Sequence, residues 1–212
     1  MNRRRFLRHT GAAMAAGVVA PVAFRFYSAP MEWAQTAGAP GITAVLFEER
    51  YRDCRIFADA LAALGAQPFA INGNSAAPWY GPLRVHLASV RGVVAGLTAE
   101  SDRGVSLACG RELHLTRVYE GAHDARRSSS IVHRIQAAAH PDEIAAALRR
   151  AHESWSESLA LVLHRTRFLG TLSITSPALT GGSGDRIVRT SSLTSDFPGY
   201  LTSWLLATPP SI

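Results

Sequence analysis

The 212-residue sequence contains no lysine, so all of its 22 basic residues are arginines. A phosphate loop of the Walker type ends in Lys-Ser or Lys-Thr, and the glycine-rich loop TGGSGD at 180–185 has no such ending. Cysteine is also scarce. Cys54 and Cys109 form no CxxC pair, which excludes c-type haem attachment and a four-cysteine zinc site. Because HxH, HExxH and GxSxG do not occur, no metal site is predicted and the signature of serine hydrolases is missing.

The loop after the first predicted strand also lacks the patterns that bind common cofactors. A dinucleotide site needs G-x-G-x-x-G there, so that backbone amides can approach the pyrophosphate, but the loop reads FEERYRDC. Its two carboxylates would repel phosphate, so a standard NAD, FAD or FMN site is not expected and any cofactor is left unknown. Paired acids also occur in response-regulator receivers, but those need a lysine after the fourth strand, and this chain has none.

Long apolar runs are absent near the N-terminus. The uncharged segment 11–24 has 14 residues, whereas a membrane-spanning helix needs about 20. Before this segment the chain reads RRRFLR, and a basic start followed by a short apolar run is typical of a signal peptide. The pair Arg3 and Arg4, followed by Phe6 and Leu7, resembles the twin-arginine (Tat) export signal.

This resemblance implies that the Tat translocase exports the protein to the periplasm in its folded form. Many Tat passengers load a cofactor before export, so the resemblance also favours a cofactor without identifying one. We expect residues 1–39 to be a signal peptide and linker and residues 40–212 to form a single domain. Cleavage between Ala23 and Ala39 and retention as an uncleaved anchor are both open.

The positive charge is concentrated in the predicted signal. Five arginines and no acid precede residue 30, and the remainder holds 17 arginines against 16 acids. The formal charge of +6 therefore falls to +1 without residues 1–29. The high isoelectric point is thus an export feature, and no nucleic-acid partner is expected.

Hydrophobic periodicity predicts alternating strands and helices over residues 42–120. Continuous apolar runs indicate strands, and apolar residues at helical spacing indicate the helices between them. The predicted strands are 42–47, 67–71, 91–97 and 114–120, and helices are predicted at 51–65, within 79–90 and within 98–113. We therefore expect an α/β fold, a flavodoxin-like or Rossmann-like three-layer sandwich with a mainly parallel sheet of order 2-1-3-4. Both cysteines lie on apolar helix faces, which favours free buried thiols over a disulfide.

The pattern changes after Glu120. A strand at 131–137 and one long helix at 141–164 are predicted, because Pro141 and two acids mark a helix start and an apolar stripe follows. A strand within 168–179 leads into the loop 180–185, and 200–207 is either a final strand or a short helix. These elements form an extension of the same domain.

Ligands of open α/β sheets bind at the carboxyl ends of the strands, near the point where the strand order reverses. That rule selects candidate residues without a sequence motif. The catalytic candidates are Glu48, Glu49 and His123, and the ligand-binding candidates are Asn74, Trp79, Tyr80, Thr98 and Glu100. The acids and the tryptophan among them could instead have purely structural roles. Acids are common in the first turn of a helix, and tryptophan usually packs in a core.

Three functions remain open. The first is a small-ligand-binding protein, or an accessory protein for an exported partner enzyme. The second is a periplasmic hydrolase or isomerase that uses the strand-end carboxylates with His123. The third is a structural partner subunit that docks through an exposed C-terminal segment, 197–210. Convergence of Glu48, Glu49 and His123 in one pocket would favour the enzyme, and their separation would favour the binding protein.

Overall fold

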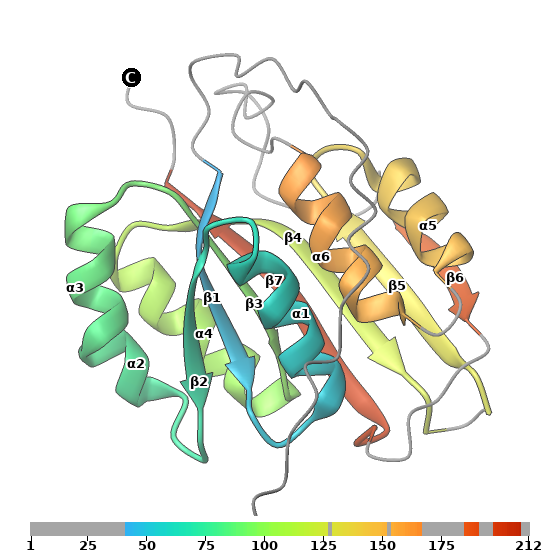
Figure 1. The fold of residues 1–212 in the computed structure, drawn as a ribbon, viewed down its shortest axis with the longest axis horizontal. Helices are drawn as coiled ribbons and strands as arrows, with labels where there is room; N and C mark the ends of the chain where they lie inside the picture. The colour runs from blue at the N-terminus through green and yellow to red at the C-terminus, as the bar shows by residue number, and fades with distance from the viewer. Residues whose placement is uncertain (1–40, 127–128, 152–153, 167–184, 191–196, 209–212) are drawn as a thin grey trace, which may run out of the picture. The chain divides into compact units, whose positions relative to one another are not determined.

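The computed structural model describes residues 41–126, 129–151, 154–166, 185–190 and 197–208. They form one seven-stranded mixed sheet of order β2-β1-β3-β7-β4-β5-β6, with helices packed against it (Figure 1). The strands are β1 Ile42–Glu48, β2 Gln67–Ile71, β3 Val93–Thr98, β4 Thr116–Asp124, β5 Ile131–Ala137, β6 Arg186–Thr190 and β7 Tyr200–Ala207. The helices are α1 Arg52–Ala62, α2 Ala76–Tyr80, α3 Pro82–Ser89, α4 Glu100–Glu112, α5 Pro141–Arg150 and α6 Trp155–Arg165.

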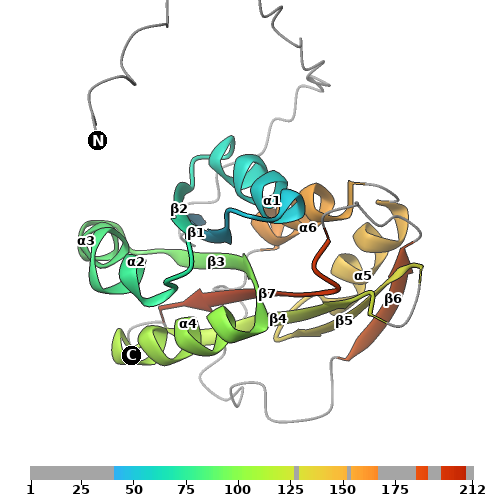
Figure 2. The same cartoon turned by 90° about the horizontal axis from the view of Figure 1, so that it is seen from below.

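The first half of the sheet has the predicted architecture. Strand β1 pairs in parallel with β2 on one side and with β3 on the other. Helix α1 packs on one face of these strands and α2, α3 and α4 on the other (Figure 2), and two separate apolar clusters fill the two interfaces. The α/β fold and the order 2-1-3 are therefore confirmed.

The prediction of a mainly parallel sheet with β4 beside β3 is wrong. Strand β7, the last element of the fold, lies between β3 and β4 and runs antiparallel to both. The pairs β4–β5 and β5–β6 are antiparallel as well, so only the two pairings of β1 are parallel. Residues 201–207 are all buried, which explains the apolar sequence of β7 and contradicts its prediction as an exposed docking segment.

The second half of the sheet has described helices on one face only. Helix α5 packs on β5 and β6, and α6 packs on α1 and α5 (Figure 2). The predicted single helix 141–164 is wrong in its length: residues 141–150 and 155–165 form two helices, and the buried apolar residues of both belong to the same core cluster. The predicted strand within 168–179 and nearly all of the loop 180–185 lie outside the described residues, as does the predicted signal.

A close contact between β3 and β7 holds the centre of the sheet. The Trp204 indole lies directly over Gly96, its opposite neighbour in the register, and stacks against Trp79 with ring centroids 6.4 Å apart. Its Nε1 donates a hydrogen bond to Thr98 Oγ1 at 3.3 Å. Only a glycine on β3 leaves room for this ring, because a Cβ on Gly96 would stand 2.1 Å from it.

The two cysteines are free and buried, as predicted. Burial raises the pKa of the Cys54 thiol, and Cys109 lies in the other apolar cluster, so the two sulfurs belong to opposite faces of the sheet. Within the ranges given above, no helix has the length and apolar character needed to traverse a bilayer.

Candidate functional site at the strand ends

Glu48 ends strand β1 and is the most buried carboxylate at this edge of the sheet. Residues alternate between the faces of a strand, so Glu48 follows Ala44 and Leu46 onto the face covered by α2 and α4. Its side chain exposes nothing to solvent. The Arg50 guanidinium holds the carboxylate by two parallel bonds, from Nε to Oε1 at 2.8 Å and from Nη2 to Oε2 at 2.9 Å. This pairing holds the pKa of Glu48 below its usual value.

Two more side chains approach Glu48 from other loops. Asp102 lies in the first turn of α4, after β3, and Ser75 precedes α2, after β2. The Ser75 hydroxyl and the Glu48 carboxyl both lie close enough to the Asp102 carboxyl to act on its pKa. Burial and the negative charge of Glu48 raise the pKa of Asp102 above its usual value, although the Ser75 hydroxyl acts in the opposite direction. We call Glu48, Arg50, Ser75 and Asp102 the acidic switch-point site.

The position of this site follows from the topology. From β1 the chain passes over one face through α1 to reach β2, and from β2 it passes over the opposite face to reach β3. The strand order therefore reverses between β1 and β3, which is where open α/β sheets bind ligands. The acidic switch-point site draws its residues from the end of β1 and the turn after it, the start of α2 and the first turn of α4.

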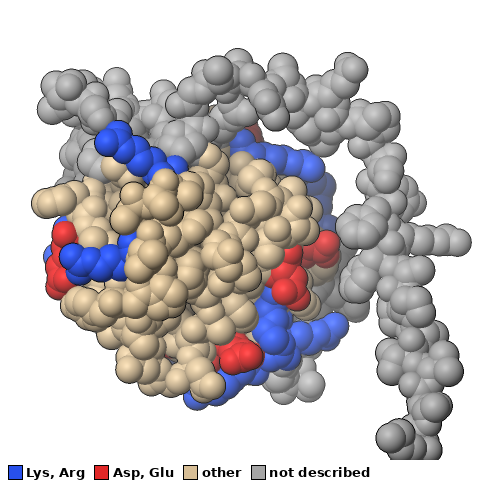
Figure 3. Space-filling model, turned by 60° about the vertical axis from the view of Figure 1, so that its left-hand side comes forward, with Lys and Arg blue, Asp and Glu red and all other residues tan. Residues whose placement is uncertain are grey.

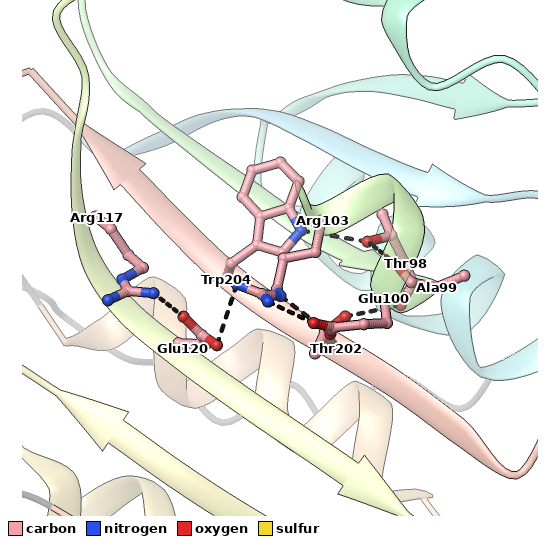
Figure 4. Close-up of polar contacts among 8 residues, drawn as sticks. All are labelled: Thr98, Ala99, Glu100, Arg103, Arg117, Glu120, Thr202 and Trp204. Atoms are coloured by element: carbon pink, nitrogen blue, oxygen red, sulfur yellow. Dashed lines mark hydrogen bonds and ion pairs between the residues drawn. The ribbon is translucent and has the colours of Figure 1, made fainter. Parts of the chain in front are cut away.

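Thr98 and Glu100 make polar contacts outside the acidic switch-point site, with Trp204 and Arg103 (Figure 4). Thr98 is the last residue of β3, is fully buried, and accepts the hydrogen bond of Trp204. Glu100 is largely exposed and pairs with Arg103, whose guanidinium also reaches Glu120 on β4 at 3.3 Å. These contacts tie α4 to the sheet, which is a structural role for Glu100.

The loop candidates after β2 also have structural contacts. Asn74 Oδ1 accepts hydrogen bonds from the backbone N–H groups of Ala76 and Ala77, at 3.1 and 3.2 Å, and so caps the start of α2. Trp79 is buried and donates its Nε1 hydrogen bond to Ser106 at 3.2 Å. Tyr80 is 60% exposed and its hydroxyl meets Glu112.

The two remaining catalytic candidates lie apart from Glu48. Glu49 is exposed in the turn after β1, and its carbonyl oxygen accepts a bond from Arg55. His123 is on β4, two strands beyond β3, and faces α6 on the opposite side of the sheet. With a strand spacing of about 4.8 Å, β1 and β4 are roughly 14 Å apart. Glu48, Glu49 and His123 therefore do not converge.

The part of the chain that the structure describes contains no group of three or more His, Cys, Asp or Glu side chains able to hold a metal ion. The acidic switch-point site brings together two carboxyl groups, a guanidinium and a hydroxyl, which can form hydrogen bonds and handle protons. Its ionised Glu48 can accept hydrogen bonds or hold a cation, and Asp102 can retain a proton at a pH where a free aspartate has lost it.

Comparison with protein-family models, with curated proteins and with solved structures finds no match for this chain. The site is therefore interpreted from its own geometry.

Proposed function

We propose that this chain is a periplasmic protein, exported by the Tat translocase, that binds a small polar ligand at the acidic switch-point site. One observation carries the proposal: Glu48, Ser75 and Asp102 meet at the reversal of strand order although they come from the end of β1, the start of α2 and the first turn of α4. Separation of His123 from Glu48 supports ligand binding over acid–base catalysis by that pair. The N-terminal RRRFLR pattern supports export.

The charges of the site define the ligand class. The Glu48 carboxylate is buried with one exposed arginine as its cation, and Asp102 adds a second acid beside it. An anion placed here would meet two acids in a partly dehydrated setting, which is unfavourable. The ligand that fits is a neutral or cationic polar molecule with hydrogen-bond donors, and a nucleotide phosphate does not fit.

Thermal shift with a panel of metabolites tests this proposal. A ligand at about 100 times its dissociation constant should add roughly 2.7 kcal/mol to the free energy of unfolding. We expect Glu48→Gln to remove most of this ligand-dependent gain, because the amide keeps the shape of the side chain without its charge. Glu49→Gln is the matched control, since Glu49 is the next residue, carries the same group and is exposed.

Each variant is measured with and without ligand, and only the difference between the two free energies of unfolding is compared. An effect of the substitution on the unliganded protein therefore cancels. Stabilisation by NAD, FAD or FMN that is equal in wild type and Glu48→Gln would contradict the site. Equal losses in Glu48→Gln and Glu49→Gln would contradict it too, because the exposed control residue does not contact Asp102 or Ser75 in the proposed arrangement.

A second candidate is a hydrolase or isomerase that uses Glu48 and Asp102. The observation in its favour is that their pKa values are shifted in opposite directions. Such a pair can supply an ionised base and a protonated acid at the same pH. The rate would fall in acid as Glu48 gains a proton, and in alkali as Asp102 loses its own. A rate that stays flat across both titrations would exclude this candidate.

A third candidate is an accessory or structural protein that docks on an exported partner. Because β7 is buried, the C-terminal strand cannot be the docking surface. A broad uncharged surface instead covers the side of the molecule that carries α2 and α3 (Figure 3), where Tyr80 and Val85 are 60% and 72% exposed. Charged side chains lie mainly around its margin.

A further inference from the structure

A chain of five polar side chains crosses the sheet on the face opposite the acidic switch-point site. Tyr119 Oη lies 2.9 Å from Ser203 Oγ, and Ser203 Oγ lies 2.8 Å from His123 Nε2. His123 Nδ1 lies 2.7 Å from His133 Nδ1, and His133 Nε2 lies 2.8 Å from Thr190 Oγ1. The chain thus connects β7, β4, β5 and β6, and His123 and His133 are direct partners in the β4–β5 register.

This chain is enclosed by the fold. Thr190 is 5% exposed, and the other four side chains expose nothing. From α6, the indole of Trp155 lies over both imidazoles, with ring centroids 4.5 Å from His123 and 5.1 Å from His133. Gly121 leaves the room that the chain needs, because a Cβ there would stand 2.4 Å from the Tyr119 hydroxyl.

The Ser203–His123 contact has the geometry of a nucleophile and its base, but a buried serine in the middle of a sheet cannot reach a substrate. Proton counting points to another role. Two nitrogens 2.7 Å apart share a single proton, so one imidazole donates at Nδ1 and the other accepts. In the neutral pair the two outer Nε2 atoms then carry one proton between them, and the hydroxyls of Ser203 and Thr190 complete the chain in either direction.

The pair can accept one additional proton and no more. With that proton both Nε2 atoms donate, and the hydroxyls of Ser203 and Thr190 turn to accept. A second additional proton would place two N–H groups against each other in the 2.7 Å gap. Even the first is costly, because it leaves a cation on imidazoles that the fold closes off from bulk solvent.

Among the residues that the structure describes, no carboxylate acts on the pKa of either imidazole. Burial lowers the pKa of His133 to about 3. Burial also lowers the pKa of His123 well below its usual value, and the neighbouring His133 contributes a smaller decrease. The groups that face the pair are the Tyr119 phenol, the hydroxyls of Ser203 and Thr190, and the Trp155 ring. Asp53 of α1 is hydrogen-bonded by Ser156 of α6 and does not act on the pKa of either imidazole.

We propose that the His123–His133 pair is an acid-sensitive latch that holds α6 against the β4–β5–β6 part of the sheet. The latch is closed while both rings are neutral. Acid favours a state in which α6 moves away and both imidazoles reach water, because there they can take up protons freely. The direction follows from the linkage between proton binding and stability. Opened imidazoles have an ordinary pKa of about 6.5 and bind protons that the closed imidazoles do not. The closed state therefore has its full stability above about pH 6.5 and loses it as the pH falls toward 3.

Hydrogen exchange of the wild-type protein at pH 7 and pH 5 tests the latch, after correction for the intrinsic pH dependence of exchange. Each imidazole that is freed on opening should lower protection roughly 25-fold between these values, as follows from an opened pKa of about 6.5. Two freed imidazoles should lower the protection of residues 155–165 by several hundredfold. Residues 100–112 of α4 are the internal control and should lose far less protection.

His133→Gln removes one titrating group and keeps hydrogen-bonding atoms, so the loss over 155–165 should shrink to about 25-fold in this variant. If the variant does not fold, the comparison of α6 with α4 in the wild type decides alone. Corrected protection of 155–165 that does not change with pH overturns the latch. Equal losses in α4 and α6 also overturn it, since they would mean that acid opens the whole fold rather than this layer.

Discussion

Replacing Gly96 by alanine should destabilise the fold by about 3 kcal/mol, close to the upper end of what overpacking of a core costs. The new Cβ would stand 2.1 Å from the Trp204 ring, and real Cβ atoms do not approach a neighbour so closely. The indole cannot move aside freely, because it stacks on Trp79 and donates its hydrogen bond to Thr98. Urea unfolding of the purified domain measures the change.

Gly104→Ala is the matched control for this prediction. Gly104 lies within α4, and a Cβ there would meet nothing within 4 Å. Alanine favours a helix interior over glycine by roughly 1 kcal/mol, so the control should leave stability unchanged or raise it. A Gly96→Ala protein as stable as the Gly104→Ala protein would show that Trp204 does not lie over β3 as described.

Replacing Arg3 and Arg4 together by lysine should leave the protein in the cytoplasm. The substitution conserves charge, so a signal that needs only a basic start would still function, whereas a twin-arginine signal would not. Cell fractionation followed by immunodetection measures the effect, and we expect the periplasmic pool to disappear. Arg25→Lys, which lies after the apolar segment, is the control and should be exported normally.

Export of the double variant at the wild-type level would contradict the Tat interpretation. It would also remove the main support for a periplasmic location, because the remaining charge and composition of the chain do not indicate a compartment.

The local periodicity of the sequence predicted the alternating strands and helices of the first part of the fold, through β3. Strands 42–47 and 67–71 and the helix between them match β1, β2 and α1 closely. Strand β7 could not be placed in this way, because its partners β3 and β4 are about a hundred residues earlier in the chain. Its apolar residues 201–207 indicated burial, but apolarity alone does not distinguish an edge from the centre of a sheet.

The strand-end rule predicted only part of the proposed acidic switch-point site. The strand-end rule selected Glu48 and the loop after β3, but it chose Glu100 in that loop, whereas Asp102 faces Glu48. In the first turn of a helix, positions two residues apart point in directions about 200° apart, so a small change in the helix start decides which acid turns inward. The strand-end rule also covers Ser75, which follows the second strand, whereas Arg50 carried no sequence signal because its role depends on the folded geometry.

His123 was placed at the rim of the strand-end site for a similar reason. Its strand was predicted to end at residue 120, which left His123 in a loop, but β4 continues to Asp124. The alternation of buried and partly exposed residues along β4 then turns His123 toward α6 and His133. Alternation in the sequences AHD and IVHRIQA is the signal from which two inward-facing histidines could have been predicted.

Native mass spectrometry of the protein purified from its own periplasm tests the central claim most directly, that the acidic switch-point site holds a small polar ligand. Wild-type protein should carry an added small mass that is released on denaturation, and Glu48→Gln purified in the same way should lack it while Glu49→Gln retains it. The claim is contradicted if wild type and Glu48→Gln carry the same added mass, or if that mass is a nicotinamide or flavin nucleotide. A wild-type protein that carries no added mass and gains none from a periplasmic extract contradicts it as well.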